Sequence, residues 1–132
     1  MKHTSMAIAM VAMLAITACS KKQSPQAVSE EPVTAIGFWE GKIGAGTTMG
    51  LYYGVLLHKN GTMRAYQGGS DSASALKADG TWQINGNSIK LTYKMASAAS
   101  NTICSALSNS NFTSMNGDYE VGMVKGKFAL SK

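Results

Sequence analysis

The sequence predicts an all-β protein whose folded part is a small antiparallel up-and-down β-barrel of about eight strands. Three observations support this prediction. After Ala35 the apolar residues recur at every second position, loops rich in Gly and Asn separate the apolar runs, and no segment combines the period, caps and length of a helix. Because closing a meander of short strands removes its exposed edges, a barrel is favoured over the alternative, an open β-sandwich or meander.

The first three strands are predicted at 36–44, 50–58 and 62–68. The alternation in the second puts four residues on one face: Leu51, Tyr53, Val55 and Leu57. Tyr52 and Leu56 then lie on the opposite face, so this strand is apolar on both sides. The three-residue loop 59–61, with Gly61 in the left-handed region, is predicted to pair Leu57 with Met63.

The fourth and fifth strands are predicted at 79–84 and 88–95. The segment "SIKLTYKM" has apolar residues at alternate positions, which are Ile89, Leu91, Tyr93 and Met95. We expect a turn at Asn85–Gly86 that pairs Trp82 with Ile89. The preceding segment 72–78, "SASALKA", is long enough for a single helical turn.

The last three strands are predicted at 102–107, 112–119 and 126–131. The first of them contains "ICSAL", in which Cys104 is expected to be a small buried hydrophobic residue.

The N-terminus has the three-part layout of an export signal. A short positive start is followed by an apolar run from Met6 to Ile16 and then by small residues up to Cys19. Because a membrane-spanning helix needs roughly 20 apolar residues, a permanent transmembrane anchor is not expected here. One alternative is an ordinary secreted protein that is cut nearby and whose cysteine is incidental.

The residues Ile16-Thr17-Ala18-Cys19 resemble the lipobox of bacterial lipoproteins. This resemblance implies that Cys19 receives a diacylglyceryl group, that the peptide before it is removed, and that the new amino terminus is acylated, typically with palmitate. In Gram-negative members of that family, Ser20 in place of Asp implies transport to the outer membrane. We therefore expect a membrane anchor at Cys19 on the periplasmic face of the outer membrane.

The chain then divides into three parts. Residues 1–18 form the signal peptide, and 19–34 comprise the lipidated cysteine and a flexible tether that contains both prolines. This tether lacks large apolar residues beyond valine, so it cannot offset the entropy of ordering. Residues 35–132 are enough for one small domain.

The segment "IGFWEGKI" carries the pattern Gly-x-Trp, with Gly37 and Trp39 at the entrance to the first predicted strand. It resembles the start of the barrel in the lipocalin and avidin superfamily. The resemblance implies that Trp39 plugs one end of the barrel beneath a basic side chain from the last strand, for which Lys127 is the expected residue. Gly117-Asp118-Tyr119 is similar to the second motif of that family.

The composition argues against several functions. The formal net charge is +5, but Arg64 is the single arginine, and a nucleic-acid surface usually clusters Arg with aromatic residues. The sequence has no HxxxH, CxxC or Walker pattern and no serine with an evident base. We therefore expect neither an enzyme nor a protein that uses a metal or cofactor.

Two binding hypotheses remain. In the first, outward-facing residues form a patch that docks another envelope or secreted protein, in an inhibitor, immunity or assembly role. The residues of this patch are Tyr52, Leu56, Arg64 and Tyr66. In the alternative, Tyr53, Trp82 and Tyr93 line a cavity that carries a small hydrophobic ligand. In a barrel this small, we favour an interior that is filled by its own side chains.

Overall fold

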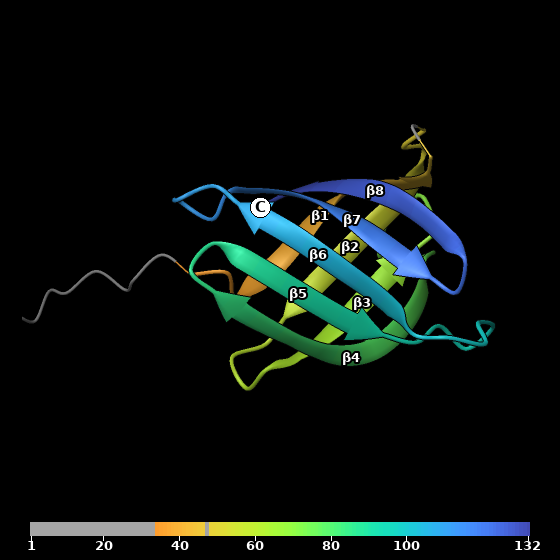
Figure 1. The fold of residues 1–132 in the computed structure, drawn as a ribbon, viewed down its shortest axis with the longest axis horizontal. Coiled ribbons are helices and arrows are strands. Elements are labelled where there is room, and N and C mark those ends of the chain that lie inside the picture. The colour runs from red at the N-terminus through yellow and green to blue at the C-terminus, as the bar shows by residue number, and fades with distance from the viewer. Residues whose placement is uncertain (1–33, 47) are drawn as a thin grey trace, which may run out of the picture. The chain divides into compact units, whose positions relative to one another are not determined.

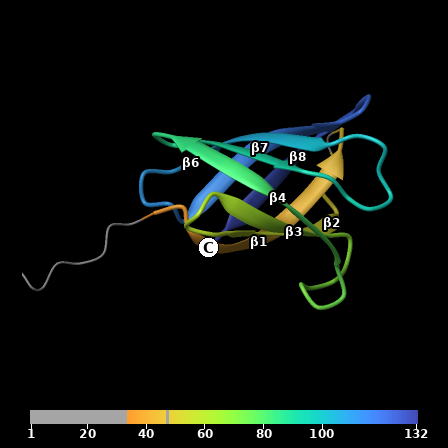
Figure 2. The same cartoon turned by 90° about the horizontal axis from the view of Figure 1, so that it is seen from below.

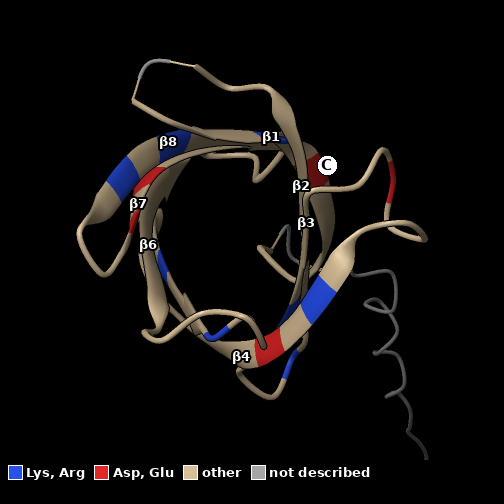
Figure 3. Cartoon of the chain, turned by 90° about the vertical axis from the view of Figure 1, so that its right-hand side faces the viewer, with Lys and Arg blue, Asp and Glu red and all other residues tan. Residues whose placement is uncertain are grey.

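The computed structural model describes residues 34–46 and 48–132, and strands make up all the regular structure in that part of the chain. The eight strands are β1 (Gly37–Ala45), β2 (Leu51–Leu57), β3 (Thr62–Gln67), β4 (Leu76–Asn85), β5 (Ser88–Tyr93), β6 (Thr102–Ser108), β7 (Ser114–Val121) and β8 (Val124–Ser131). Each pairs antiparallel with the next, and β8 pairs with β1 to close the barrel (Figures 1 and 3). The predicted fold class, a small lipocalin-like up-and-down barrel, is confirmed.

The predicted signal peptide and the lipidation site at Cys19 lie outside the described residues. Thr34, the last residue of the predicted tether, is described and contacts the barrel. Its carbonyl oxygen accepts a hydrogen bond from Lys132 Nζ at 2.8 Å, and its hydroxyl accepts one from the Ile36 amide at 3.2 Å. No helix in the described residues is long and apolar enough to cross a membrane.

The β2–β3 hairpin has the predicted geometry. Leu57 pairs with Met63 across the loop, and Gly61 has a φ of 86°. The Gly61 amide donates to the His58 carbonyl, while the His58 amide donates to the Thr62 carbonyl. The left-handed glycine lets three loop residues reverse the chain while the apolar faces stay aligned.

The predicted turn between β4 and β5 is wrong by one residue. The loop consists of Gly86 and Asn87, so Trp82 pairs with Leu91 rather than with Ile89. Gly86 has a φ of 65° and stands at the first loop position, where a type II′ turn has its glycine. Because the pairing moves by two residues, the same side chains still face the interior.

Several strand boundaries also differ from the prediction. Only residues 72–74 of the segment 72–78 form a hydrogen-bonded turn, and residues 76–78 belong to β4, which begins at Leu76, three residues earlier than predicted. β7 and β8 are joined by a two-residue turn at 122–123, so β7 begins and ends two residues later than predicted, and β8 begins two residues earlier. Met95 lies beyond the end of β5, where it packs against the core in a half-buried position.

The core fills the inside of the barrel. Large side chains that are almost completely buried come from most strands, namely Trp39, Ile43, Tyr53, Leu57, Met63, Ile89, Leu91, Tyr93, Met115 and Phe128. The strands run obliquely around this core (Figure 2). The strong bending needs inward-facing glycines: a Cβ at Gly41 would collide with the Ala129 carbonyl of the neighbouring strand.

One end of the barrel, here named the Trp39 end, holds the start of β1 and the loops 58–61, 86–87 and 109–113. Trp39 is completely buried there, and its indole nitrogen donates to the Ala35 carbonyl at 2.8 Å. The basic residue over its ring is Lys132, at 5.3 Å from the centroid. The expectation for Lys127 is therefore wrong, because β1 pairs Gly44 with Lys127, five residues beyond Trp39, and Lys127 binds Asp118 on the outside instead.

Candidate functional site

The outer face of β1, β2 and β3 gathers the residues predicted to bind a partner. The pairing places Phe38 beside Leu56, Leu56 beside Arg64, and Gly54 beside Tyr66. Figure 2 shows these three strands side by side. We name this surface the outer patch, and its residues are Phe38, Tyr52, Leu56, Arg64 and Tyr66.

An aromatic pair lies at the centre of the outer patch. The rings of Phe38 and Tyr66 meet edge to face, with centroids 5.6 Å apart and planes at 85°. They come from β1 and β3 and meet across Gly54 of β2. A Cβ on Gly54 would lie 3.2 Å from Cζ of Phe38, so the missing side chain makes room for the Phe38 ring.

Sequence reasoning did not include Phe38 in this patch. The signal was present, because strand residues alternate between faces and the buried Trp39 forces its neighbour outward. Phe38 keeps 37% of its surface exposed.

Tyr52 does not provide the exposed aromatic anchor that was predicted. Its side chain is on the outer face, but only 9% of the residue is exposed. The hydroxyl donates to Glu40 Oε2 at 2.9 Å. Burial and the nearby Glu40 carboxylate raise the Tyr52 pKa to about 12, so the hydroxyl stays protonated and keeps this bond. Tyr52 is therefore a covered residue of the outer patch, while Phe38 is exposed and Leu56 and Tyr66 are half-buried.

Arg64 is held by its neighbour on β4. Its Nε and Nη2 donate to the two carboxylate oxygens of Asp79, at 2.7 and 3.2 Å. The hydrogen bond from Arg64 and its positive charge lower the Asp79 pKa. The same hydrogen bond and the negative charge of Asp79 raise the Arg64 pKa. Lys77 lies on the other side of Tyr66, with its Nζ 5.9 Å from the ring centroid. The aromatic pair is thus bordered by fixed polar groups, as in a typical interface.

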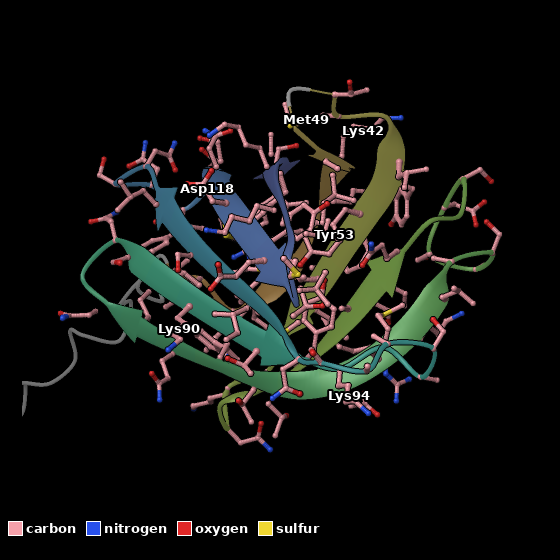
Figure 4. All side chains as sticks on the ribbon, turned by 45° about the vertical axis from the view of Figure 1, so that its right-hand side comes forward. Lys42, Met49, Tyr53, Lys90, Lys94 and Asp118 are labelled. Carbon is pink, nitrogen blue, oxygen red and sulfur yellow. The ribbon has the colours of Figure 1, made fainter. Side chains whose placement is uncertain are left out.

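The residues predicted to line a ligand cavity are packed against other side chains. Tyr53 is completely buried and its ring centroid lies 5.4 Å from that of Phe128 and 6.5 Å from that of Tyr93. Figure 4 shows Tyr53 within the barrel, whereas Lys90 and Lys94 of the β5 side lie outside. The Tyr53 hydroxyl is 3.4 Å from the Cys104 sulfur, and that of Tyr93 donates to Gln67 at 3.4 Å.

Trp82 lies apart from these two tyrosines. It is half-buried near the Trp39 end, and its indole nitrogen donates to the His58 carbonyl at 2.8 Å, which fixes the β2–β3 loop against β4. The described clefts, of about 120 to 420 Å³, are open to solvent, and none is lined by Tyr53, Trp82 or Tyr93.

Cys104 has the environment of a structural residue. It is completely buried, and burial raises its thiol pKa to about 11. A reactive cysteine needs a lowered pKa and access to solvent. His58 is exposed in the β2–β3 loop, and among the described residues no group of three or more His, Cys, Asp and Glu is placed to hold a metal ion.

Comparison with known proteins finds no match to a protein-family model, to a curated protein or to a solved structure.

Proposed function

We propose that this chain is a lipid-anchored bacterial envelope protein whose β-barrel binds a partner protein through the outer patch. The anchor is the acylated Cys19, the tether is the segment up to residue 34, and the location is the periplasmic face of the outer membrane. The partner is another envelope or secreted protein, which this chain inhibits, neutralises or helps to assemble. The activity needs no cofactor or metal.

The observation that carries the partner hypothesis is the solvent-accessible pair of Phe38, which is 37% exposed, and Tyr66, which is half-buried. Large aromatic side chains bordered by basic residues are the usual anchors of protein interfaces. This pair is positioned in advance by the edge-to-face contact and by Gly54 beneath it. Because few rotamers must be frozen on binding, such a patch binds at a low entropic cost.

The packing of the interior supports partner binding over the carrier hypothesis. A carrier needs a space that the side chains leave empty. In this barrel Tyr53, Tyr93, Phe128 and Cys104 contact one another at the place where such a ligand would lie. A mass spectrum of the native, unlipidated chain with a bound small molecule would restore the carrier hypothesis.

The partner hypothesis is tested with the mature, unlipidated chain as bait for envelope extract of the native host. We expect one protein to be retained by the wild type and by Leu107→Ala, and to be lost with Phe38→Ala combined with Tyr66→Ala. Leu107 is the matched control because it is 66% exposed on β6, away from the outer patch. The captured protein is then purified and must bind the bait alone; equal recovery by the double variant rejects the outer patch.

The anchor is tested separately. Mass spectrometry of the protein from its native host should find the chain starting at Cys19 with acyl chains, and Cys19→Ser should abolish membrane association. Because two or three acyl chains gain about 0.8 kcal/mol per buried methylene, the lipidated form should resist extraction with salt. An unmodified Cys19, with the leader attached or cut elsewhere, rejects the anchor hypothesis. It does not affect the hypothesis that the outer patch binds a partner.

A further inference from the structure

Three Asn–Gly pairs occur in the folded part of the chain: Asn60–Gly61, Asn85–Gly86 and Asn116–Gly117. In such a pair the glycine has no side chain to keep its amide nitrogen away from the preceding side-chain carbonyl. That nitrogen can attack the carbonyl carbon when both groups are free to approach. The three pairs have the same reactive atoms, so the structure around them decides which one reacts.

Asn60–Gly61 is held at both reactive groups. The Asn60 side-chain oxygen accepts hydrogen bonds from the Thr62 amide at 3.1 Å and the Thr62 hydroxyl at 2.6 Å. The Gly61 amide, which would be the nucleophile, donates to the His58 carbonyl at 3.2 Å. Reaction here requires the loss of three hydrogen bonds.

Asn116–Gly117 is held by the sheet. Both residues lie within β7, and Gly117 pairs with Ala106 on one side and with Phe128 on the other. Its backbone therefore belongs to the closed ladder. Rotating the Gly117 amide toward Asn116 requires local opening of β6, β7 and β8.

Asn85–Gly86 is free at both groups. Asn85 is the last residue of β4 and Gly86 the first of the β4–β5 turn, and both are exposed. Within the described part of the chain, no hydrogen bond holds the Asn85 side chain and no backbone carbonyl accepts the Gly86 amide. The turn is fixed one residue later instead, where Asn87 donates to the Asn109 carbonyl at 2.9 Å.

We propose that Asn85 is a site of selective spontaneous deamidation in the folded protein. The Gly86 amide nitrogen gives up its proton and forms a bond to Cγ of Asn85, the Cγ–Nδ2 bond breaks, and the side-chain nitrogen takes up that proton and leaves as ammonia. A five-membered imide results. Water then adds to either imide carbonyl, which opens the ring to aspartate or to isoaspartate. Water is the sole co-reactant, and no oxidant or reductant is involved.

The product changes the β4–β5 hairpin in two ways. Each deamidation replaces the neutral amide of Asn85 with a carboxylate. This negative charge lies at the Trp39 end of the barrel, two residues from Asn87. The isoaspartate form also inserts a methylene into the backbone beside the Asn85–Ser88 pair. Because that pair closes the ladder at the turn, the modified hairpin should lose its register at this position.

The test follows all three sites in one sample. A chain of residues 20–132 contains the complete barrel, whose eight strands pair only with one another. It is incubated in mildly alkaline buffer, folded or in concentrated urea, and peptides are analysed by mass spectrometry for replacement of amide by carboxylate. In urea all three sites should react at similar rates; in the folded protein Asn60 and Asn116 should react about tenfold or more slowly than Asn85, because they must first open.

Two variants sharpen the result. Asn85→Gln removes the five-membered ring closure and should leave the folded protein almost unmodified over the same time. Thr62→Val removes the 2.6 Å hydrogen bond to Asn60 and should speed reaction at that site alone. The proposal is overturned if folded Asn60 or Asn116 reacts as fast as Asn85, or if folding slows Asn85 as much as the other two.

Discussion

Lys132 and Trp39 join the two ends of the folded chain. The Lys132 ammonium lies 5.3 Å from the Trp39 ring centroid and donates to the Thr34 carbonyl at 2.8 Å. A Cβ at Gly37 would lie 3.0 Å from Cε of Lys132, and Gly37 has a φ of 123°. Glycine is therefore favoured at this position both by the close contact and by the backbone conformation. The first residue of the Gly-x-Trp pattern thus makes room for the lysine that covers the third.

Lys132→Ala should lower the free energy of unfolding by about 1 to 2 kcal/mol, because it removes a cation–π contact and a hydrogen bond. Urea unfolding followed by tryptophan fluorescence measures the change. Lys127→Ala is the matched control on β8, the strand that ends just before Lys132, since it removes only an exposed ion pair with Asp118. An equal or larger loss for Lys127→Ala would contradict the assignment of Lys132.

Tyr53→Ala should destabilise the barrel by about 3 to 5 kcal/mol, because it leaves a cavity between Phe128, Tyr93 and Cys104. Tyr53→Phe keeps the ring and removes only the contact between hydroxyl and sulfur, so it should cost about 1 kcal/mol. Urea midpoints of the two variants separate packing from hydrogen bonding. Similar small losses for both would mean that the interior is loosely packed.

Cys104 should make the fold sensitive to alkali. Burial raises its pKa from the ordinary thiol value of 9.0 to about 11, so the folded state holds the proton more tightly than an exposed thiol does. The contribution of Cys104 to the free energy of unfolding is therefore constant below about pH 9 and falls as the pH rises toward 11. The loss should be smaller in Cys104→Ala, which is tested by urea unfolding across this range; equal slopes would contradict it.

The same burial should protect the thiol from reagents. In the chain of residues 20–132, which lacks Cys19, Cys104 should react with a thiol reagent only after unfolding. Rapid labelling of the folded protein would show that the barrel opens easily on the β6 side.

Asp79 should titrate below the ordinary range of an aspartate, because its pKa is lowered first by the hydrogen bond from Arg64. A folded pKa below the unfolded one means that the pair stabilises the fold at higher pH. This contribution is lost as the pH falls through the lowered pKa. Carboxyl NMR titration of Arg64→Met should move the Asp79 pKa back toward its ordinary value; no movement would contradict the pairing.

The sequence was sufficient for the number and order of the strands and for most of the inner face, because a buried interior imposes alternation on most strands. The β2–β3 register followed from Gly61 and from the pairing of Leu57 with Met63. The β4–β5 register did not follow. Turns at Asn85–Gly86 and at Gly86–Asn87 keep the same faces inward, so the apolar pattern cannot distinguish them.

The candidate site was only partly predictable. Tyr66 and Leu56 lie where alternation placed them, and Phe38 was recoverable from its neighbour Trp39. The burial of Tyr52 was not, because it depends on Glu40 of another strand. Lys132 was likewise missed, since its position opposite Trp39 depends on how the last strand closes against the first.

The pairing of β8 with β1 limits how any partner can dock. An open sheet can accept an extended peptide as one more strand through main-chain hydrogen bonds. Each of the eight described strands already has two neighbours, so no main-chain edge is available for such β-augmentation. Side chains and loops must therefore make the contacts by which this barrel recognises a partner. Single substitutions on its surface should alter specificity more than they would in a domain that binds through a strand edge.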